Sequence, residues 1–223
     1  MAPATKGGAK FDPVAVEQVE WRAQRDLGAR VPAAEPTDAD GARASDGEPS
    51  GGEAAWGLGG FDPPGRWRRW LRDGHPPRFR VPGDVAITVV EAGDTGSFAA
   101  TAAFGLHLPA RAEAGFATLP GKPGWRCYLT SVGESPAALA TFADGPIVLI
   151  ALDATAEAGR RSPAHMALLH RAISDATRGG AGVIGARLDE ESGEREAAAP
   201  LLLAGFEKAY RCPSWVDAGL PAS

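Results

Sequence analysis

Residues that could hold a phosphate follow an apolar run in the middle of this 223-residue chain. The run Ile147–Leu152 is continuously apolar, as expected of a strand buried on both faces. Arg160 and Arg161 come next, and Ser162-Pro163 then has the composition of a helix start, with serine as N-cap and proline in the first turn. Such an arrangement directs backbone N–H groups, the positive end of a helix and guanidinium groups at one place. It predicts an anion site built from a strand, a loop and a helix.

The same stretch resembles the second half of a GCN5-related N-acetyltransferase (GNAT). In the branch of that family that this chain most resembles, the strand ends in threonine, and an R-x-x-G-x-(G/A/Q) loop that begins five residues later leads into a helix that opens Ala-Leu-Leu. Thr155, Arg160 and Ala167-Leu168-Leu169 hold those positions here without a gap. Pro163 stands where the family has its first glycine, which removes one N–H donor, and His165 stands at the second small residue or glutamine.

This resemblance implies an α+β fold, in which a mixed central sheet splays between its middle strands and carries helices on both faces. It also implies that the loop holds the pyrophosphate of acetyl-CoA, the co-substrate. The cofactor-binding residues that it implies are Leu152, Asp153, Ala154, Arg160, Arg161, Ser162, Ala164 and His165. A backbone N–H between Leu152 and Ala154 would polarise the thioester carbonyl, a role that any side chain permits.

The groups that would move protons depart from the family pattern. Many GNATs place a tyrosine, the acid toward the departing thiolate, shortly before a Gly-Phe pair, which is Gly205-Phe206 here; Leu201 holds that position. The candidate catalytic residues are therefore Asp153, Glu157 and Tyr210. A carboxylate at a buried strand end can act as a base, but loop solvation and capping are the slightly favoured explanation of Asp153 and Glu157. Tyr210 is better explained as a core or edge aromatic on the last strand than as an acid.

Two functions remain open at this point. The first is acyl-CoA-dependent N-acyltransfer, with acetyl moving from acetyl-CoA to an amine by direct attack. The second is a non-catalytic GNAT-fold protein that binds acyl-CoA or has a regulatory or interaction role. The amine acceptor is not identified by the residues, and a homodimer is left open.

Charge and cysteine content bear on the partners, metals and cellular setting that we expect for this protein. The net charge of −5 implies no general attraction to nucleic acid or to an anionic membrane, so neither is expected as a partner. Two cysteines are too few for a disulfide framework and lack metal-ligand spacing, so no metal is expected and a cytoplasmic setting is the simplest interpretation.

The N-terminal part differs in composition from the rest. Residues 13–29 have helical periodicity, residues 31–52 predict a mobile Pro/Gly/Ala-rich linker, and residues 54–59 a short edge strand. The basic run 66–72 is interpreted as a solvated amphipathic helix start rather than a phosphate contact. We expect an N-terminal appendage and linker over 1–82 and a GNAT-like acyltransferase domain over 83–223.

Alternating patterns beyond residue 84 predict the remaining elements. Strands are expected over 85–90, 125–132, 137–142, 147–152, 182–188 and 206–215. Helices are expected over 97–104, 163–178 and 197–204.

Overall fold

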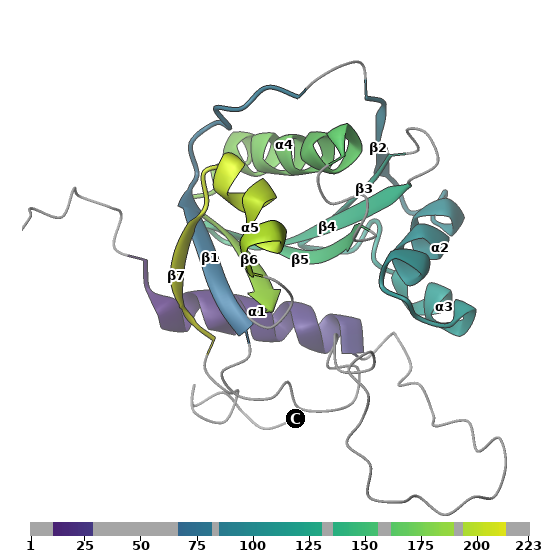
Figure 1. The fold of residues 1–223 in the computed structure, drawn as a ribbon. Coiled ribbons are helices and arrows are strands. Elements are labelled where there is room, and N and C mark those ends of the chain that lie inside the picture. The colour runs from purple at the N-terminus through teal and green to yellow at the C-terminus, as the bar shows by residue number, and fades with distance from the viewer. Residues whose placement is uncertain are drawn as a thin grey trace, which may run out of the picture.

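The computed structural model describes residues 11–28, 67–81, 85–130, 136–155, 162–189 and 194–212. A mixed seven-stranded sheet lies between two layers of helices (Figure 1). One face is covered by α1 (Pro13–Gly28), α2 (Gly96–Gly105), a 3-10 turn (Ala110–Ala112) and the short α3 (Glu113–Phe116). The other face is covered by α4 (Pro163–Arg178) and α5 (Glu194–Leu203). This arrangement confirms the α+β fold class with helices on both faces.

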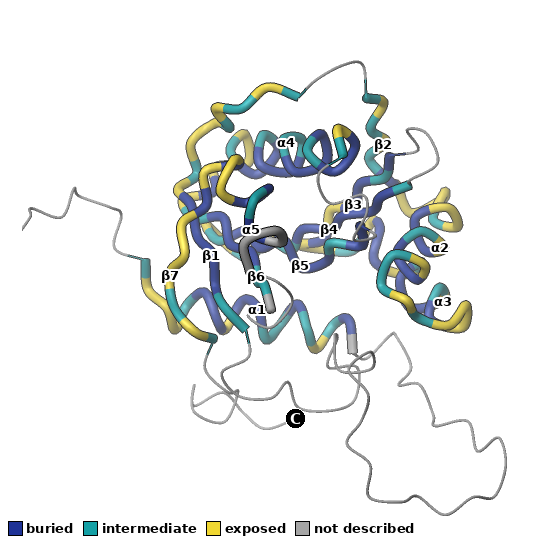
Figure 2. The backbone as a smooth tube through the Cα atoms, in the orientation of Figure 1, coloured by how far each residue is buried: buried dark blue, intermediate teal, exposed yellow. Residues whose placement is uncertain are grey.

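The sheet has the strand order β2-β3-β4-β5-β6-β1-β7, and β5–β6 is its parallel pair while the other neighbours are antiparallel. Its strands are β1 (Trp67–Asp73), β2 (Ile87–Val90), β3 (Trp125–Thr130), β4 (Ala137–Asp144), β5 (Ile147–Thr155), β6 (Val183–Asp189) and β7 (Glu207–Arg211). The central strands are buried along most of their length, whereas β7 is largely exposed (Figure 2). The elements predicted beyond residue 84 are confirmed where the structure describes them, with slightly different ends, and the last residues of the predicted strands 125–132 and 206–215 lie outside the described residues. Helix α3 was not predicted.

The interpretation of residues 66–72 as a solvated helix start is wrong. Residues 67–73 form β1, which lies inside the sheet between β6 and β7. Its side chains alternate between the two helix layers, so Trp70 packs in the α4 core while Leu71 packs in the α1 core. The arginines misled the prediction, because Arg69 is fully buried rather than solvated.

The sheet therefore includes residues from both sides of the division expected between residues 82 and 83. Helix α1, predicted over 13–29, also belongs to this body, because Val16 and Val19 pack on Leu71 and Leu149 of the sheet. The predicted linker (31–52) and edge strand (54–59) lie outside the described residues.

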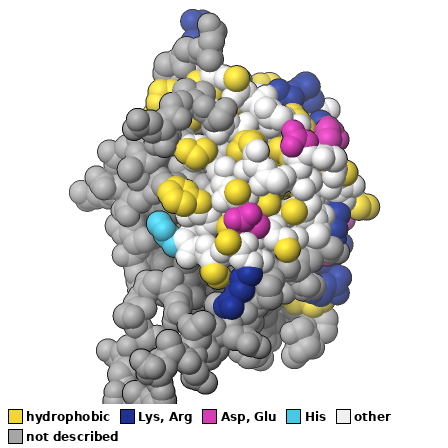
Figure 3. Space-filling view, turned by 90° about the vertical axis from the view of Figure 1, so that its right-hand side faces the viewer, with side chains coloured by type: hydrophobic (Ala, Val, Ile, Leu, Met, Phe, Trp, Pro, Cys, Tyr) yellow, Lys and Arg dark blue, Asp and Glu magenta, His cyan; other side chains and the backbone are white. Residues whose placement is uncertain are grey.

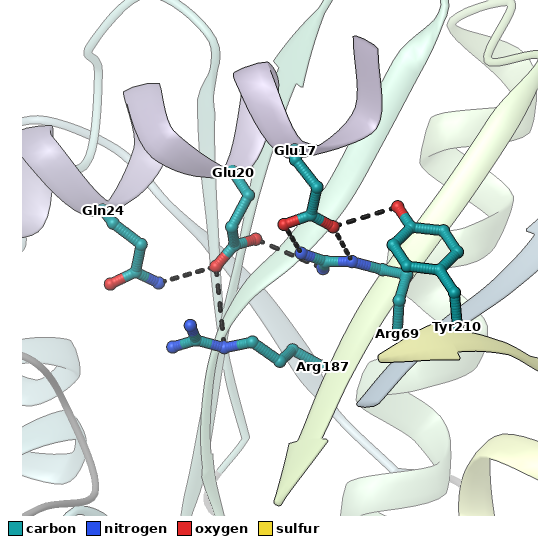
Figure 4. A network of polar contacts seen from close by, with 6 residues as sticks. All are labelled: Glu17, Glu20, Gln24, Arg69, Arg187 and Tyr210. Atoms are coloured by element: carbon teal, nitrogen blue, oxygen red, sulfur yellow. Dashed lines mark hydrogen bonds and ion pairs between the residues drawn. The ribbon is translucent and has the colours of Figure 1, made fainter. Parts of the chain in front are cut away.

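A buried ionic network joins α1 to the sheet (Figure 4). Arg69 on β1 donates two hydrogen bonds to the Glu17 carboxylate, of 2.9 and 3.2 Å, and a third to Glu20 at 3.4 Å. Tyr210 on β7 donates its hydroxyl proton to Glu17 at 2.9 Å. Because both carboxylates and the guanidinium are buried, each depends on the others for the interactions that water would otherwise supply.

Glu20 completes the network through two further contacts. The side-chain amide of Gln24 donates to it at 2.8 Å, and Arg187 on β6 lies 3.8 Å away. Burial by itself raises the pKa of the Glu20 carboxyl, but the attraction of Arg69 and Arg187, with the hydrogen bond from Gln24, holds that pKa below its usual value.

Acidification is therefore expected to weaken the fold. A carboxyl whose pKa is lower in the folded than in the unfolded state stabilises the fold fully above its unfolded pKa, and loses this contribution as the pH falls through the folded pKa. We expect the free energy of unfolding, measured by urea titration, to fall below about pH 4.5, and to fall less steeply in Glu20→Gln. An identical acid dependence in the two proteins would contradict a role for this carboxylate.

Candidate functional site

Strands β5 and β6 separate part of the way along the sheet. They pair only at Ile147↔Val183, Val148↔Ile184 and Leu149↔Gly185. Beyond these pairs, β5 continues to Thr155 alongside β4, and β6 continues to Asp189 alongside β1. Within the described residues, the facing edges of these two strands therefore present backbone N–H and C=O groups that no sheet partner uses. This divergence confirms the splayed sheet that the sequence predicted.

Two local features accompany the divergence. The register of β4 against β5 moves from Ala140↔Leu152 to Thr141↔Ile150, which leaves Ala151 as an extra residue in β5. Such a bulge bends and twists the strand that contains it. On β6, a Cβ at Gly185 would lie 2.6 Å from Leu149 Cδ2, so the absence of a side chain allows Leu149 to fill the last paired position.

Helix α4 begins at the carboxyl end of β5. Ser162 is its N-cap, as predicted, and the Ser162 hydroxyl oxygen accepts the backbone N–H of His165 at 3.2 Å. Pro163 has no N–H to offer. Among the described residues at the start of this helix, Ala164 therefore has a backbone N–H that takes no part in capping. The helix end is positive but has fewer main-chain donors for an anion than a glycine-rich turn would have.

Two predicted site residues meet between β5 and α4. The Nε2 atom of His165 lies 2.9 Å from Oδ2 of Asp153, and the Thr155 hydroxyl donates to Oδ1 of the same carboxylate at 2.8 Å. The side chain of His165 is 3% exposed, whereas that of Asp153 is 35% exposed. Asp153 thus presents a partly accessible carboxylate beyond the point where β5 and β6 separate.

The neighbouring β5 residues face the other helix layer. Leu152 and Ala154 are fully buried among residues of α2, β3 and β4. Gly105, the last residue of α2, lies against Ala154 so closely that a Cβ there would overlap the Ala154 carbonyl. Helix α2 therefore lies at the end of β5 that also carries Asp153. Figure 3 faces the α2–α3 side of the molecule, and its described residues show basic and acidic side chains interspersed with hydrophobic ones.

The structure does not bring Tyr210 together with Asp153. Tyr210 is on β7, which β6 and β1 separate from β5, and its hydroxyl is hydrogen-bonded to Glu17. Burial, with the nearby Glu17 carboxylate, raises the pKa of Tyr210 far above its usual value. Leu201, at the position of the family tyrosine, is buried in α5. Glu157, Arg160 and Arg161 lie outside the described residues.

Arg72 has a structural role in the described part of β1. Its guanidinium donates to the backbone carbonyls of Ala204 and His75, and lies 5.9 Å from the centre of the Phe206 ring. It therefore supports the turn after α5.

In the described ranges, no helix is long and apolar enough to cross a membrane, and no three His, Cys, Asp or Glu side chains gather as metal ligands would.

Comparison with known proteins identifies the fold. No family model matches the sequence, and no curated protein does. Among solved structures, a GCN5-related N-acetyltransferase from Sphaerobacter thermophilus matches with a TM-score of 0.50 and 16% identity, over 66% of this chain and 50% of that one. Another from Kribbella flavida matches with a TM-score of 0.41 and 18% identity, over 64% of this chain and 54% of that one. The matched region thus spans about half of each of these structures.

Proposed function

Because the chain has the GCN5-related N-acetyltransferase fold, we propose that it is an acyl-CoA-dependent N-acyltransferase that moves an acetyl group from acetyl-CoA to an amine. The observation that carries the proposal is the divergence of β5 and β6 beyond Leu149↔Gly185, with the N-terminus of α4 beside it. An extended chain containing amides can pair with a free strand edge, and a pyrophosphate is favoured at the positive end of a helix.

The residues have separate roles in this proposal. Main-chain groups from Leu152 to Ala154 bind the thioester end of the donor, where an N–H polarises the carbonyl. Ser162 and Ala164, at the start of α4, would contact the pyrophosphate, and from the sequence we expect the guanidinium groups of Arg160 and Arg161 to bind it. The charge of the two arginines compensates for Pro163, which has no main-chain donor to offer at this turn.

Attack by the amine is direct, without an acyl-cysteine intermediate. The thiolate is the nucleophilic form of cysteine, so a thiol with a high pKa is a poor nucleophile at neutral pH. Burial raises the pKa of Cys127 to about 12. Burial likewise raises the pKa of Cys212 to about 12, although Arg69 and Arg187 act in the opposite direction.

The second candidate is a protein with this fold that binds acyl-CoA without turning it over. It is favoured by Leu201, which places a buried aliphatic side chain where the family has its acid. The cap formed by Ser162 and Pro163 also leaves few main-chain donors at the start of α4. These two functions make the same prediction for binding and opposite predictions for turnover.

Calorimetric titration with acetyl-CoA tests the binding that both candidate functions predict. We expect micromolar binding that Arg160→Ala weakens about tenfold, equivalent to roughly 1.4 kcal/mol. Arg178→Ala, at the other end of α4, is the matched control and should bind like the wild type. Absence of binding by the intact protein would contradict both candidates.

A measurement of turnover then distinguishes the transferase from the non-catalytic binding protein. The release of free CoA thiol is followed with acetyl-CoA and a panel of diamines, amino sugars and lysine peptides. Amine-dependent thiol release supports the transferase, whereas binding without release with any of these amines favours the non-catalytic protein.

A further inference from the structure

We propose that Asp153 acts first as the base and then as the acid of the transfer, and that His165 is the positioning residue for its carboxylate. This inference rests on the proposed function and goes beyond it, since it replaces the missing tyrosine acid. It also changes the role of His165 from the phosphate ligand implied by the family resemblance to a support for Asp153.

The carboxylate of Asp153 is held from two directions. Thr155, on the same strand, donates to Oδ1 at 2.8 Å, and the His165 ring lies 2.9 Å from Oδ2. A base must begin as an ionised carboxylate, which is only an acceptor, so the proposal places the proton of this second contact on Nε2 of the imidazole. These contacts, one to each oxygen, help to fix the carboxylate plane, as a base that must meet a particular proton requires.

His165 is itself held by the start of α4. Its backbone N–H is bound by the Ser162 hydroxyl, and its side chain is 3% exposed. A ring so deeply buried, with one nitrogen directed at a carboxylate, is poorly suited to bind a phosphate from solvent. The 35% exposure of Asp153 means that the carboxylate, rather than the imidazole, can reach a substrate.

The location of Asp153 fits this role. It lies four positions along β5 from Leu149, the last residue paired with β6, and pairs with Leu139 of β4. Its main chain therefore belongs to the β5 edge that is proposed to bind the thioester end of the donor. A side chain on this stretch of strand is near the reacting atoms, whereas Tyr210, two strands beyond β6, is not.

One carboxylate can carry the whole proton transfer. The amine nitrogen attacks the thioester carbonyl carbon and forms the C–N bond, and Asp153 accepts the proton that the nitrogen loses. The C–S bond breaks with its electron pair on sulfur, and the same proton passes from Asp153 to the thiolate. The products are the amide and CoA thiol, and the carboxylate is restored without a second acid. This accounts for a buried leucine at position 201.

The test combines three variants with separate measurements of binding and turnover. Asp153→Asn removes the base, His165→Leu removes the donor to Oδ2, and His165→Gln retains an N–H donor. Dissociation constants for acetyl-CoA come from calorimetry, and kcat and KM come from thiol release with the best amine of the panel. His170→Leu, on the same helix and outside this site, is the control, and thermal melts verify that each variant is folded.

We expect Asp153→Asn to lower kcat at least 100-fold and His165→Leu at least 10-fold, with binding of acetyl-CoA and KM for the amine changed less than threefold. His165→Gln should recover most of the lost kcat, and His170→Leu should match the wild type. A fall in binding that accounts for the loss in His165→Leu would assign this residue to the donor site and overturn the inference. Unchanged kcat in Asp153→Asn would also overturn it while leaving the transferase intact. Binding without turnover by the wild type would reject both the inference and the transferase.

Discussion

Replacement of Arg69 by methionine is expected to lower the free energy of unfolding by about 3–5 kcal/mol. The side chain of Arg69 is fully buried and forms hydrogen bonds with Glu17 and Glu20, which are themselves buried. Methionine retains much of the volume but leaves two carboxylates without their principal counter-charge. Since small domains have a total stability of about 5–15 kcal/mol, this one change could remove most of it. Urea titration at neutral pH measures the effect.

Arg80→Met is the matched control, because Arg80 is an exposed arginine outside this network. Its effect should remain within about 0.5 kcal/mol. The pH gives a second control: Arg69 lowers the pKa of the Glu20 carboxyl in the wild type, and the variant lacks this attraction, so the deficit of Arg69→Met should shrink as the pH falls towards about 4. A deficit independent of pH would assign the loss to packing instead.

Replacement of Gly105 by alanine is expected to cost about 2–3 kcal/mol and to weaken acetyl-CoA binding. The added Cβ would overlap the carbonyl of Ala154, and a backbone group cannot move aside as a flexible side chain can. Relief of the overlap requires α2 to move from β5, next to the strand end that carries Asp153. Thermal melts and calorimetry on the same samples measure the two effects.

Gly96→Ala provides the control within the same helix. Gly96 is the first residue of α2, and a Cβ there would meet nothing within 4 Å. Neither glycine has a positive φ, so both substitutions suit the backbone and differ mainly in the space available. We expect Gly96→Ala to leave stability unchanged or raise it by up to about 1 kcal/mol. Equal effects of the two substitutions would show that the contact with Ala154 is unimportant.

The position of β1 has a consequence for the opening between β5 and β6. Where β6 has left β5, its other edge is paired with β1, and Arg187 on β6 and Arg69 on β1 both contact Glu20 of α1. One wall of the opening is therefore supported by residues that precede the predicted acyltransferase domain. A truncation that removes α1 would leave Arg69 and Arg187 without this partner.

Local sequence determined the elements that form the site. The apolar run of β5, the Ser162-Pro163 start of α4 and the glycines after Arg178 are strong signals, because each depends on neighbouring residues and backbone preferences alone. The spacing of Thr155 and the helix residues that follow it was sufficient to predict the fold, including a splayed sheet.

Tertiary structure decided what the charged residues do. The arginines of residues 66–72 read as surface because nothing nearby in sequence could neutralise them; the partners of Arg69 lie about 50 residues away on α1. Likewise, no local pattern connects Asp153 with His165, since they meet only when α4 packs back onto β5. Burial of a charge is decided by which distant partner the fold supplies, and periodicity within one segment does not contain that information.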